Sequence, residues 1–334
     1  ENRRHDGNRT AQGLVMRLGA GIDLPASAMR MLSSLWDYNL TGGTLPPVLS
    51  VARAGSGTRI NASGLIVTEA ANAPRFDYNP TTLACRGLLL EPQATYYGPY
   101  SEDVGSTGWS LGSGTTLTPV TANSPLRLSD TVSSLGLGTQ SFSSVQTSTI
   151  VPIGTAETQC WLIRNVDAAQ TRIVYRDSTI PAQVSVTITW SSATAGAAIS
   201  SIAAAATVSG ITCTNYGSVD MGGGWYLVWA SFTFPATTSA NYLRLDPAAS
   251  PTGKSVWVAA AWVTTAAASA PPSYTQTTSG SQTRDADVLT LSDTSRPVEI
   301  AYTPLTGGAA QTAQVAAGAQ PGAISGWVTR VRQL

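Results

Sequence analysis

The residue types that carry most enzyme chemistry are scarce in this chain of 334 residues. His5 is the only histidine, so a Ser-His-Asp or Cys-His site lacks its base and a metal centre can draw on one imidazole at most. The Gly112-Ser-Gly114 stretch lacks the lysine of a Walker A motif and leads into no helical pattern. The sequence therefore predicts no catalytic residue, no cofactor and no metal.

Paired carboxylates are the remaining route to catalysis, and a glycosidase needs two of them about 5–9.5 Å apart. Glu102 and Asp103 are adjacent, so on a strand they would point to opposite faces, whereas Asp285 and Asp287 would share a face. A polysaccharide depolymerase or glycosidase that uses an Asp/Glu pair stays open as an alternative. A structural calcium ion is also left open, although the chain has no Asp-x-Asp-x-Asp loop.

Aromatic side chains are the better candidates for a binding function. The chain has nine Trp and eleven Tyr against four Phe, and rings with one polar edge suit sugar stacking and wet interfaces. The candidate carbohydrate contacts are Tyr96, Tyr97, Tyr100, Trp109, Tyr216 and Tyr242. Each of them can equally be a core or subunit-interface residue. Trp225, Trp229, Trp257 and Trp262 lie on dense apolar stretches and are expected in the core.

The amino-acid composition limits the kinds of partner that the chain is expected to bind. Only 11% of residues are charged, 43% are hydrophobic and the net charge is zero, which favours a folded core over disorder. Zero net charge argues against nucleic acid, and without a run of about 18 apolar residues no membrane insertion is expected. The widely spaced Cys85, Cys160 and Cys213 form no disulfide framework, although a Cys160–Cys213 bridge stays open.

The elements that must position these residues divide the chain into four parts. Residues 1–50 are expected to be an N-terminal anchor, with apolar helical spacing from Ser27 to Trp36 that could instead be irregular. Residues 51–95 form a connecting β module with a hairpin from Thr58 to Thr68. Residues 96–270 form a sandwich, and residues 271–334 a linker with a small β tail.

The sandwich is predicted from eight or so short strands without intervening helices, which favours an antiparallel jelly roll. Val184 to Trp190 alternates cleanly, with apolar residues at the even positions. Trp225 to Phe234 changes its apolar parity, which predicts a bulge within the strand. The Ala-rich run from Ala193 to Val208 could be a helix, but Gly196 and the β-branched neighbours make a loop between strands at least as consistent with the sequence.

Two clusters of residues resemble a module of phage tail-fibre, head-spike and gene-transfer-agent proteins. The first runs from Arg53 to Gly64 and continues with Asn72-Ala-Pro-Arg-Phe-Asp-Tyr78, Gly87-Leu-Leu-Leu-Glu91, Ser101-Glu-Asp103 and Trp109. The second joins Gly223-Gly-Trp-Tyr226 to Ser273-Tyr-Thr-Gln-Thr277 and Thr283-Arg-Asp-Ala-Asp287. Together they cover about residues 50–290, and the chain departs from the family pattern at Thr95-Tyr96.

The resemblance implies a jelly roll similar to carbohydrate-binding modules in a structural virion protein. It implies a fibre, spike or head-decoration subunit, a homotrimer that contacts other virion proteins and attaches to host cell-surface polysaccharide. Such a protein would be made in the bacterial host cytoplasm and lie on the exterior of the particle. The matched residues Arg75, Asp77, Glu91, Trp225, Arg284 and Asp287 are assigned structural roles, with the charged ones expected to pair. A purely structural decoration or adaptor subunit is the second alternative.

Overall fold

The computed structural model describes the backbone of residues 17–18, 22–23, 35–106, 108–112, 114–136, 145–149, 156–177, 183–235, 241–246, 254–264 and 270–334. Antiparallel strands dominate these residues, whose one helical element is the 3-10 turn η1 (Leu40–Gly42). A mainly β fold built from antiparallel sheets is therefore confirmed for them. The predicted helix from Ser27 to Trp36 falls almost wholly outside the described residues. Within them, no helix is long and apolar enough to cross a membrane.

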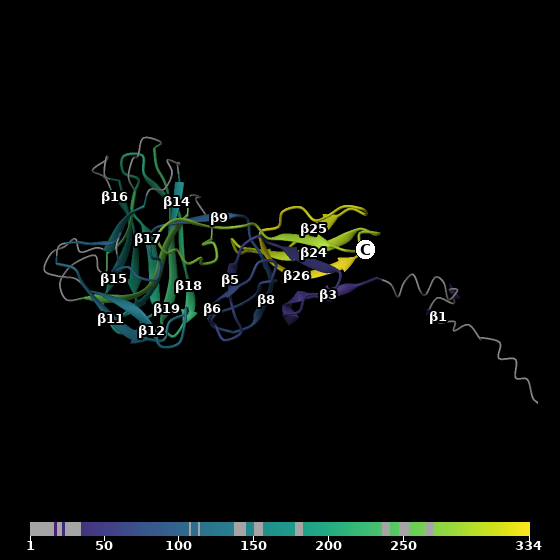
Figure 1. Cartoon of the computed structure of the whole chain (residues 1–334), viewed down its shortest axis with the longest axis horizontal. Coiled ribbons are helices and arrows are strands. Elements are labelled where there is room, and N and C mark those ends of the chain that lie inside the picture. The colour runs from purple at the N-terminus through teal and green to yellow at the C-terminus, as the bar shows by residue number, and fades with distance from the viewer. Residues whose placement is uncertain are drawn as a thin grey trace, which may run out of the picture.

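Two large sheets pack face to face at one end of the molecule and form what we call the sandwich (Figure 1). The six-stranded sheet has the order β10 (Ser110–Leu111), β13 (Val145–Thr149), β20 (Asn241–Asp246), β15 (Gln170–Asp177), β16 (Gln183–Trp190) and β17 (Ile199–Ala204). The eight-stranded sheet has the order β11 (Thr116–Ala122), β12 (Asp130–Gly136), β21 (Ser255–Thr264), β14 (Ala156–Asn165), β19 (Trp225–Thr233) and β18 (Thr212–Gly222). The short strands β9 (Ala94–Tyr97) and β22 (Gln282–Arg284) extend the second sheet beyond β21.

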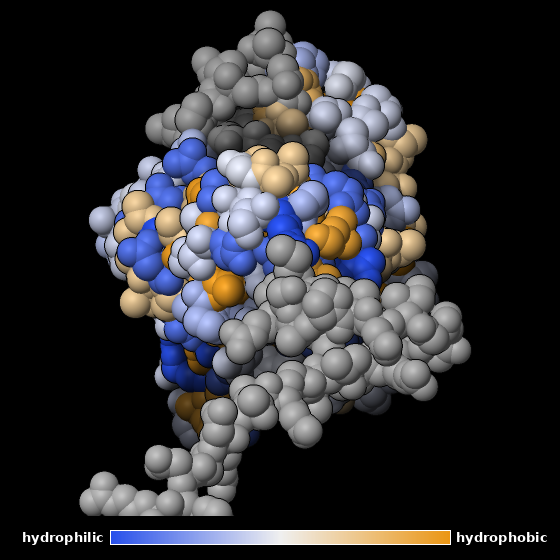
Figure 2. Space-filling view, turned by 90° about the vertical axis from the view of Figure 1, so that its right-hand side faces the viewer, coloured by the Kyte–Doolittle hydropathy of each residue, from blue (hydrophilic) through white to orange (hydrophobic). Residues whose placement is uncertain are grey.

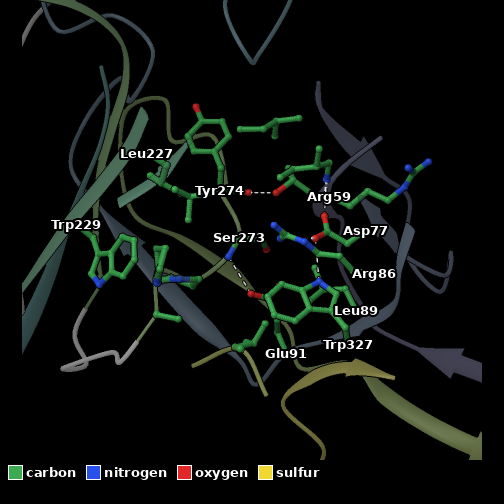
Figure 3. A pocket seen from close by; sticks show the side chains of 18 of the residues that line it. Arg59, Asp77, Arg86, Leu89, Glu91, Leu227, Trp229, Ser273, Tyr274 and Trp327 are labelled. Atoms are coloured by element: carbon green, nitrogen blue, oxygen red, sulfur yellow. Dashed lines mark hydrogen bonds and ion pairs between the residues drawn. The ribbon is translucent and has the colours of Figure 1, made fainter. Parts of the chain in front are cut away.

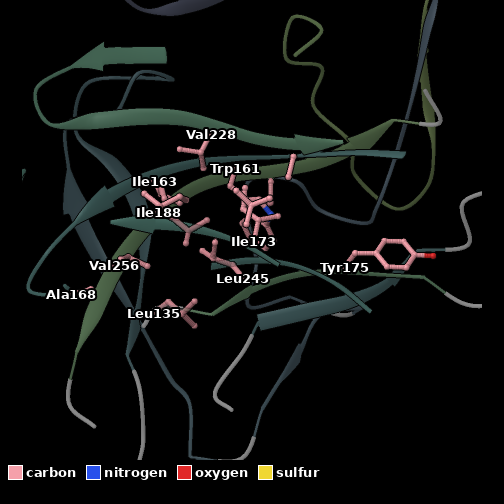
Figure 4. Close-up of a cluster of buried hydrophobic side chains, with 14 of the residues drawn as sticks. Leu135, Trp161, Ile163, Ala168, Ile173, Tyr175, Ile188, Val228, Leu245 and Val256 are labelled. Atoms are coloured by element: carbon pink, nitrogen blue, oxygen red, sulfur yellow. The ribbon is translucent and has the colours of Figure 1, made fainter. Parts of the chain in front are cut away.

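The inner faces of the two sheets share one hydrophobic core (Figure 4). In β16 the side chains of Val184, Val186, Ile188 and Trp190 are buried while the residues between them are not, so the predicted alternation is confirmed. The Ala-rich run behaves differently from its prediction. Its middle forms the strand β17, which pairs with β16 at the edge of the sheet.

The outer face of the eight-stranded sheet is covered as well, so apolar residues occur at both parities of its strands. In β19, Val228 and Phe232 enter the inner core, while Trp225, Leu227 and Trp229 pack on the outer side. β19 pairs with β14 in unbroken register, so the predicted bulge within it is wrong. The register shifts instead lie on the neighbouring strand β18.

A second body, which we call the composite module, is built from strands that flank the sandwich in the sequence. Its main sheet has the order β25 (Gln311–Val315), β24 (Val298–Pro304), β26 (Gly326–Gln333), β8 (Cys85–Leu90) and β7 (Phe76–Tyr78), and β3 (Asp37–Asn39) also pairs with β26. Three two-stranded sheets complete the described strands: β4 (Leu49–Ala52) with β23 (Val288–Leu291), β5 (Gly57–Ile60) with β6 (Ile66–Glu69), and β1 (Arg17–Leu18) with β2 (Ile22–Asp23).

The composite module has its own hydrophobic core, to which residues from both sides of the sandwich contribute, among them Leu49, Leu88, Leu289 and Val328. The hairpin predicted from Thr58 to Thr68 is confirmed as β5 and β6, which lie between the sandwich and β24 to β26 (Figure 1). Figure 2 views the module's end of the molecule, where hydrophilic residues cover much of the surface and apolar residues form separate small patches.

Candidate functional site

Five charged residues are buried together beside the joint between the composite module and the sandwich. Arg75 donates to Glu91 at 2.7 Å and also pairs with Asp287. Arg53 pairs with the other oxygen of Asp287 at 2.8 Å, and Arg284 lies 3.7 Å from Glu91 and 3.8 Å from Asp287. The structure thus brings together four of the motif residues that were expected to pair and Arg53, the first residue of the first motif cluster. We call this set the arginine cluster.

The arginine cluster holds three guanidinium groups against two carboxylates, so it carries one excess positive charge. Burial raises the pKa of Glu91, but the charges of Arg284 and Arg75 outweigh burial and lower that pKa to about 2. Backbone carbonyls supply further acceptors, because Arg53 donates to Ala70 O at 2.6 Å and Arg284 to Pro92 O at 2.7 Å. Charges buried at such a site stay stable only when they are paired and hydrogen-bonded in this way.

Asp77 lies outside the arginine cluster. One carboxylate oxygen accepts from Ile60 N at 2.7 Å, and the other accepts from Trp327 Nε1 at 2.9 Å and from Arg86 at 3.5 Å. Burial raises the pKa of this carboxyl above its usual value, although these partners act in the opposite direction. Asp77 thereby joins β5, β7 and β26.

An inter-module cavity of about 270 Å³ separates the composite module from the outer face of the sandwich (Figure 3). Its walls include Asp77, Glu91, Trp229, Tyr274 and Trp327. Glu91 accepts from Ser273 N at 2.9 Å, and both carboxylates face groups that bind them (Figure 3). The two acids in this cavity are therefore arranged as anchors between strands, with their oxygen atoms already engaged.

A second recess, which we call the loop groove, opens between the loops of the sandwich and those of the composite module. It measures about 610 Å³. The sandwich contributes the β11–β12 loop, Arg164, the β18–β19 turn, Trp225 and Trp257; the composite module contributes the β5–β6 turn and the loop between β7 and β8. Leu83 and Leu128 are exposed on its walls, at 45% and 67%.

Aromatic and polar groups are combined in the loop groove. The rings of Trp225 and Trp257 are 6.5 Å apart at 41°, and Trp225 Nε1 donates to Asn123 O at 2.8 Å. The guanidinium carbon of Arg164 lies 4.8 Å from the centre of the Trp257 ring, within the range of a cation–π contact. Asn123, Ser63 and Thr81 place amide and hydroxyl groups at the same recess.

The predicted carbohydrate contacts are placed elsewhere. Tyr96 is fully buried, and its hydroxyl donates to Ser273 O at 2.6 Å. Its ring therefore offers no surface to a sugar, and we withdraw Tyr96 as a carbohydrate contact. Trp109 packs on the buried Trp161, with ring centres 5.9 Å apart, and donates to Pro99 O. Tyr216 is 40% exposed on β18.

Tyr97 and Tyr100 are half-buried; the first pairs with Val263, and the second has a φ of 46° and donates its amide to Thr278 O. Tyr242 lies in β20, and its side chain is outside the described residues. The inter-module cavity and the loop groove are lined by none of the other five candidates, which are Tyr96, Tyr97, Tyr100, Trp109 and Tyr216.

Sequence reasoning missed Trp257 and Arg164 as groove residues. Trp257 and Trp262 are five residues apart in β21 and would face opposite sides of a regular strand. A register shift opposite Leu162 and Ile163 leaves Ala259 unpaired, so both rings turn to the outer side. Only that shift, which has no marker in the Ala-rich sequence, could have identified Trp257. Arg164 shares the outer face of β14 with Cys160 and Leu162 by regular alternation.

The remaining acids and cysteines show no reactive arrangement. Glu102 accepts from the Tyr274 hydroxyl at 2.9 Å and pairs with Arg127, while Asp103 accepts from Gly105 N at 3.1 Å. Cys160 and Cys213 are free, and burial raises the pKa of both thiols. Among the described residues no group of three His, Cys, Asp or Glu side chains could hold a metal ion.

Comparisons with known proteins identify no family for this chain. No family model matches the chain, and no curated protein matches it. A solved structure with detectable similarity is that of the CBM22-1-GH10 modules of the Clostridium thermocellum endo-1,4-β-D-xylanase 10B in complex with xylohexaose. The match has 11% sequence identity and a TM-score of 0.32, and it covers 53% of this chain but 29% of the xylanase chain.

Proposed function

We propose that this chain is a non-catalytic glycan-binding subunit of a virion, and that it attaches the particle to host cell-surface polysaccharide through the loop groove. The observation that carries the proposal is the groove itself. It combines the partly exposed ring of Trp257, the apolar side chains of Leu83 and Leu128, and the polar groups of Asn123 and Arg164. Apolar surfaces contact the C–H faces of sugars, while fixed polar groups select their hydroxyls.

The sandwich is proposed to be a jelly roll. In chain order, β11 and β12 lie in one sheet, β13 in the other, β14 in the first, β15 to β17 in the second, β18 and β19 in the first, β20 in the second and β21 in the first. Repeated crossing between two antiparallel sheets is a property of jelly rolls, and it gathers the connecting loops at the ends of the sandwich. The loop groove uses loops at one such end.

The virion role rests on the resemblance of the motifs around Arg75 and Trp225 to phage fibre and spike proteins. We propose a homotrimeric fibre, spike or head-decoration subunit, made in the host cytoplasm and carried on the particle's exterior with other virion proteins as partners. The low share of charged residues supports extensive subunit burial, because charged residues are depleted at interface cores. Sedimentation equilibrium should give three times the mass of the chain, and labelled antibody should locate it on intact particles by electron microscopy.

Glycan binding is tested with purified chain on an array of bacterial surface polysaccharides and with Trp257→Ala. This variant removes the partly exposed ring and is expected to lose binding about tenfold or more, since stacked aromatic contacts contribute about 0.5–1.5 kcal/mol in addition to the apolar area that they bury. Tyr216→Ala, an exposed aromatic outside the groove, should bind as the unaltered chain does. Equal binding by Trp257→Ala and the unaltered chain would exclude the groove.

One observation favours a second candidate function, a glycosidase or polysaccharide depolymerase. Asp77 and Glu91 line the same inter-module cavity, and their pKa values are displaced in opposite directions, as in an acid and its partner carboxylate. Release of reducing ends from host polysaccharide, lost in Asp77→Asn, would establish it. A particle-bound chain that binds no glycan would instead favour a purely structural adaptor.

A further inference from the structure

The loop groove contains a cation that no described carboxylate neutralises. Arg164 projects from β14, and its guanidinium group lies over the face of the Trp257 ring. Its Nε atom is buried and has no hydrogen-bond partner. Arg172 and Arg244 of the other sheet differ, because both pair with Asp246. An unpaired, partly desolvated guanidinium is unfavourable unless it has a function or a missing partner.

None of the described residues that line the groove is acidic, so none of them supplies that partner. The two carboxylates next to its lining residues in sequence are engaged elsewhere. Asp130 accepts from Ser124 at 2.5 Å and pairs with Arg127, and Asp220 accepts from Gly222 N at 2.8 Å. The recess therefore presents one positive charge among neutral polar and apolar groups.

The guanidinium is held in place between the indole ring and glycine backbone. A Cβ atom at Gly224, whose φ is 80°, would lie 3.3 Å from Arg164 Nε, and one at Gly196 would lie 3.4 Å from Nη2. The Gly196 loop is itself fixed, because Gly196 N donates to Asn165 O at 2.9 Å. Stacking on a ring leaves the N–H edge of an arginine available for a planar anion, which binds by two parallel hydrogen bonds.

We infer that the loop groove selects acidic glycans, and that Arg164 binds the carboxylate of a uronic or sialic acid residue. The inference rests on the proposed function, since it names the sugar class for the same groove. The ring carbons of such a residue would contact the apolar walls, while its carboxylate would neutralise the charge that the chain leaves open. A neutral sugar would leave the guanidinium without a counter-ion.

The test uses the unaltered chain and an array of oligogalacturonate, oligoglucuronate and oligosialate probes, each beside its carboxyl-reduced counterpart. The acid form of the preferred probe should bind at least about tenfold tighter than its reduced form. That preference should weaken as salt is raised from low to physiological concentration, because a partly exposed ion pair is screened. Equal binding of both forms, or tighter binding of the reduced form, would overturn the inference while leaving glycan binding intact.

Variants separate this inference from the proposed function. Arg164→Gln should bind the acid and reduced forms equally and weakly, whereas Arg296→Gln, an arginine outside the groove, should keep the preference. Trp257→Ala should lose binding to both forms. An unaltered chain that binds none of these probes but binds a neutral bacterial surface polysaccharide would overturn the inference alone, whereas one that binds no probe and no surface polysaccharide would refute glycan attachment as well. Thermal melting checks that Arg164→Gln is folded, and the acid-against-reduced comparison on the unaltered chain decides the question without any variant.

Discussion

At the scale of single residues, the arginine cluster is the most demanding feature of the molecule. Glu91 is 2% exposed and faces Arg75 and Arg284. If its negative charge were removed, water could not reach the two guanidinium groups to solvate them. Removing one partner of a buried ion network costs more than the network itself contributes, because the opposite charge is left unpaired.

Glu91→Gln is therefore expected to destabilise the chain by about 3–5 kcal/mol at pH 7. Its amide can keep the bond from Ser273 N, but it brings N–H groups toward the guanidinium of Arg75. Urea denaturation measures the loss. Glu69→Gln is the matched control, because Glu69 pairs with Arg59 where both side chains are 20–25% exposed, and its loss should stay below about 1 kcal/mol. Equal losses in the two variants would show that the cluster is not desolvated.

The same carboxylate predicts a pH dependence. The pKa of Glu91 is about 2 in the folded chain against 4.5 ordinarily, so its stabilising contribution is complete above about pH 4.5 and is lost as the pH falls toward 2. Over that window the unaltered chain should lose about 3 kcal/mol that Glu91→Gln does not lose. Denaturation midpoints of both proteins between pH 2 and 7 should converge at the acid end. Parallel curves would contradict a paired, ionised Glu91.

At the scale of elements, local patterns predicted local structure well. The hairpin of β5 and β6 follows from alternation on either side of a turn at residues 61–65, and the alternation of β16 follows from one buried face. Residues far apart in sequence are different. The pairing of β4 with β23 joins Leu49 to Leu291, and no feature of either segment identifies the other.

The candidate site was predictable to a similar extent. Arg75, Glu91, Arg284 and Asp287 were identified as pairing partners because they occur in recognisable motifs. Arg164 and Trp257 were not. Trp257 turns to the outer face only through the register shift at Ala259, and the approach of Gly196 and Gly224 to Arg164 is a contact between segments far apart in sequence. Tyr96 was misplaced because an aromatic-rich stretch reads the same whether its rings face solvent or core.

Gly87 shows how closely two elements of the composite module approach. Its φ is 121°, and a Cβ atom there would run into the carbonyl oxygen of Val328 on β26. Gly87→Ala should therefore separate β8 from β26 and destabilise the chain by about 3 kcal/mol. Gly322→Ala is the control, since a Cβ at Gly322 meets nothing within 4 Å, and it should change stability by less than about 1 kcal/mol. Urea denaturation curves of the two variants decide; a Gly87→Ala chain as stable as the control would mean that β8 and β26 can move apart freely.

At the scale of the whole molecule, the sandwich lies in the sequence between the two halves of the composite module. β23 and β26 pair with β4 and β8, although the sandwich strands come between them in the chain. The connection between the sandwich and the composite module at β9 and β22 is reinforced by the arginine cluster, which takes residues from both halves of the module. For the attachment function that we propose, this arrangement would hold the loop groove at a fixed orientation to the composite module.

This arrangement predicts an asymmetric response to removal of residues 282–334. β4 loses its partner β23, β8 loses β26, and both strands and the β7 that pairs with β8 lose much of their core, so their amides should exchange as in an unfolded chain. β14, β15 and β16 should keep their protection, because the inner core of the sandwich contains no residue of the deleted segment. Hydrogen-exchange mass spectrometry of the full and shortened chains measures both.

Adding a synthetic 282–334 peptide should restore protection in β8, since the missing strands carry the hydrogen bonds and apolar side chains that it needs. Protection lost equally in β8 and β16 would instead mean that the sandwich depends on the composite module for its folding, and protection kept in β8 would mean that the two halves do not need each other.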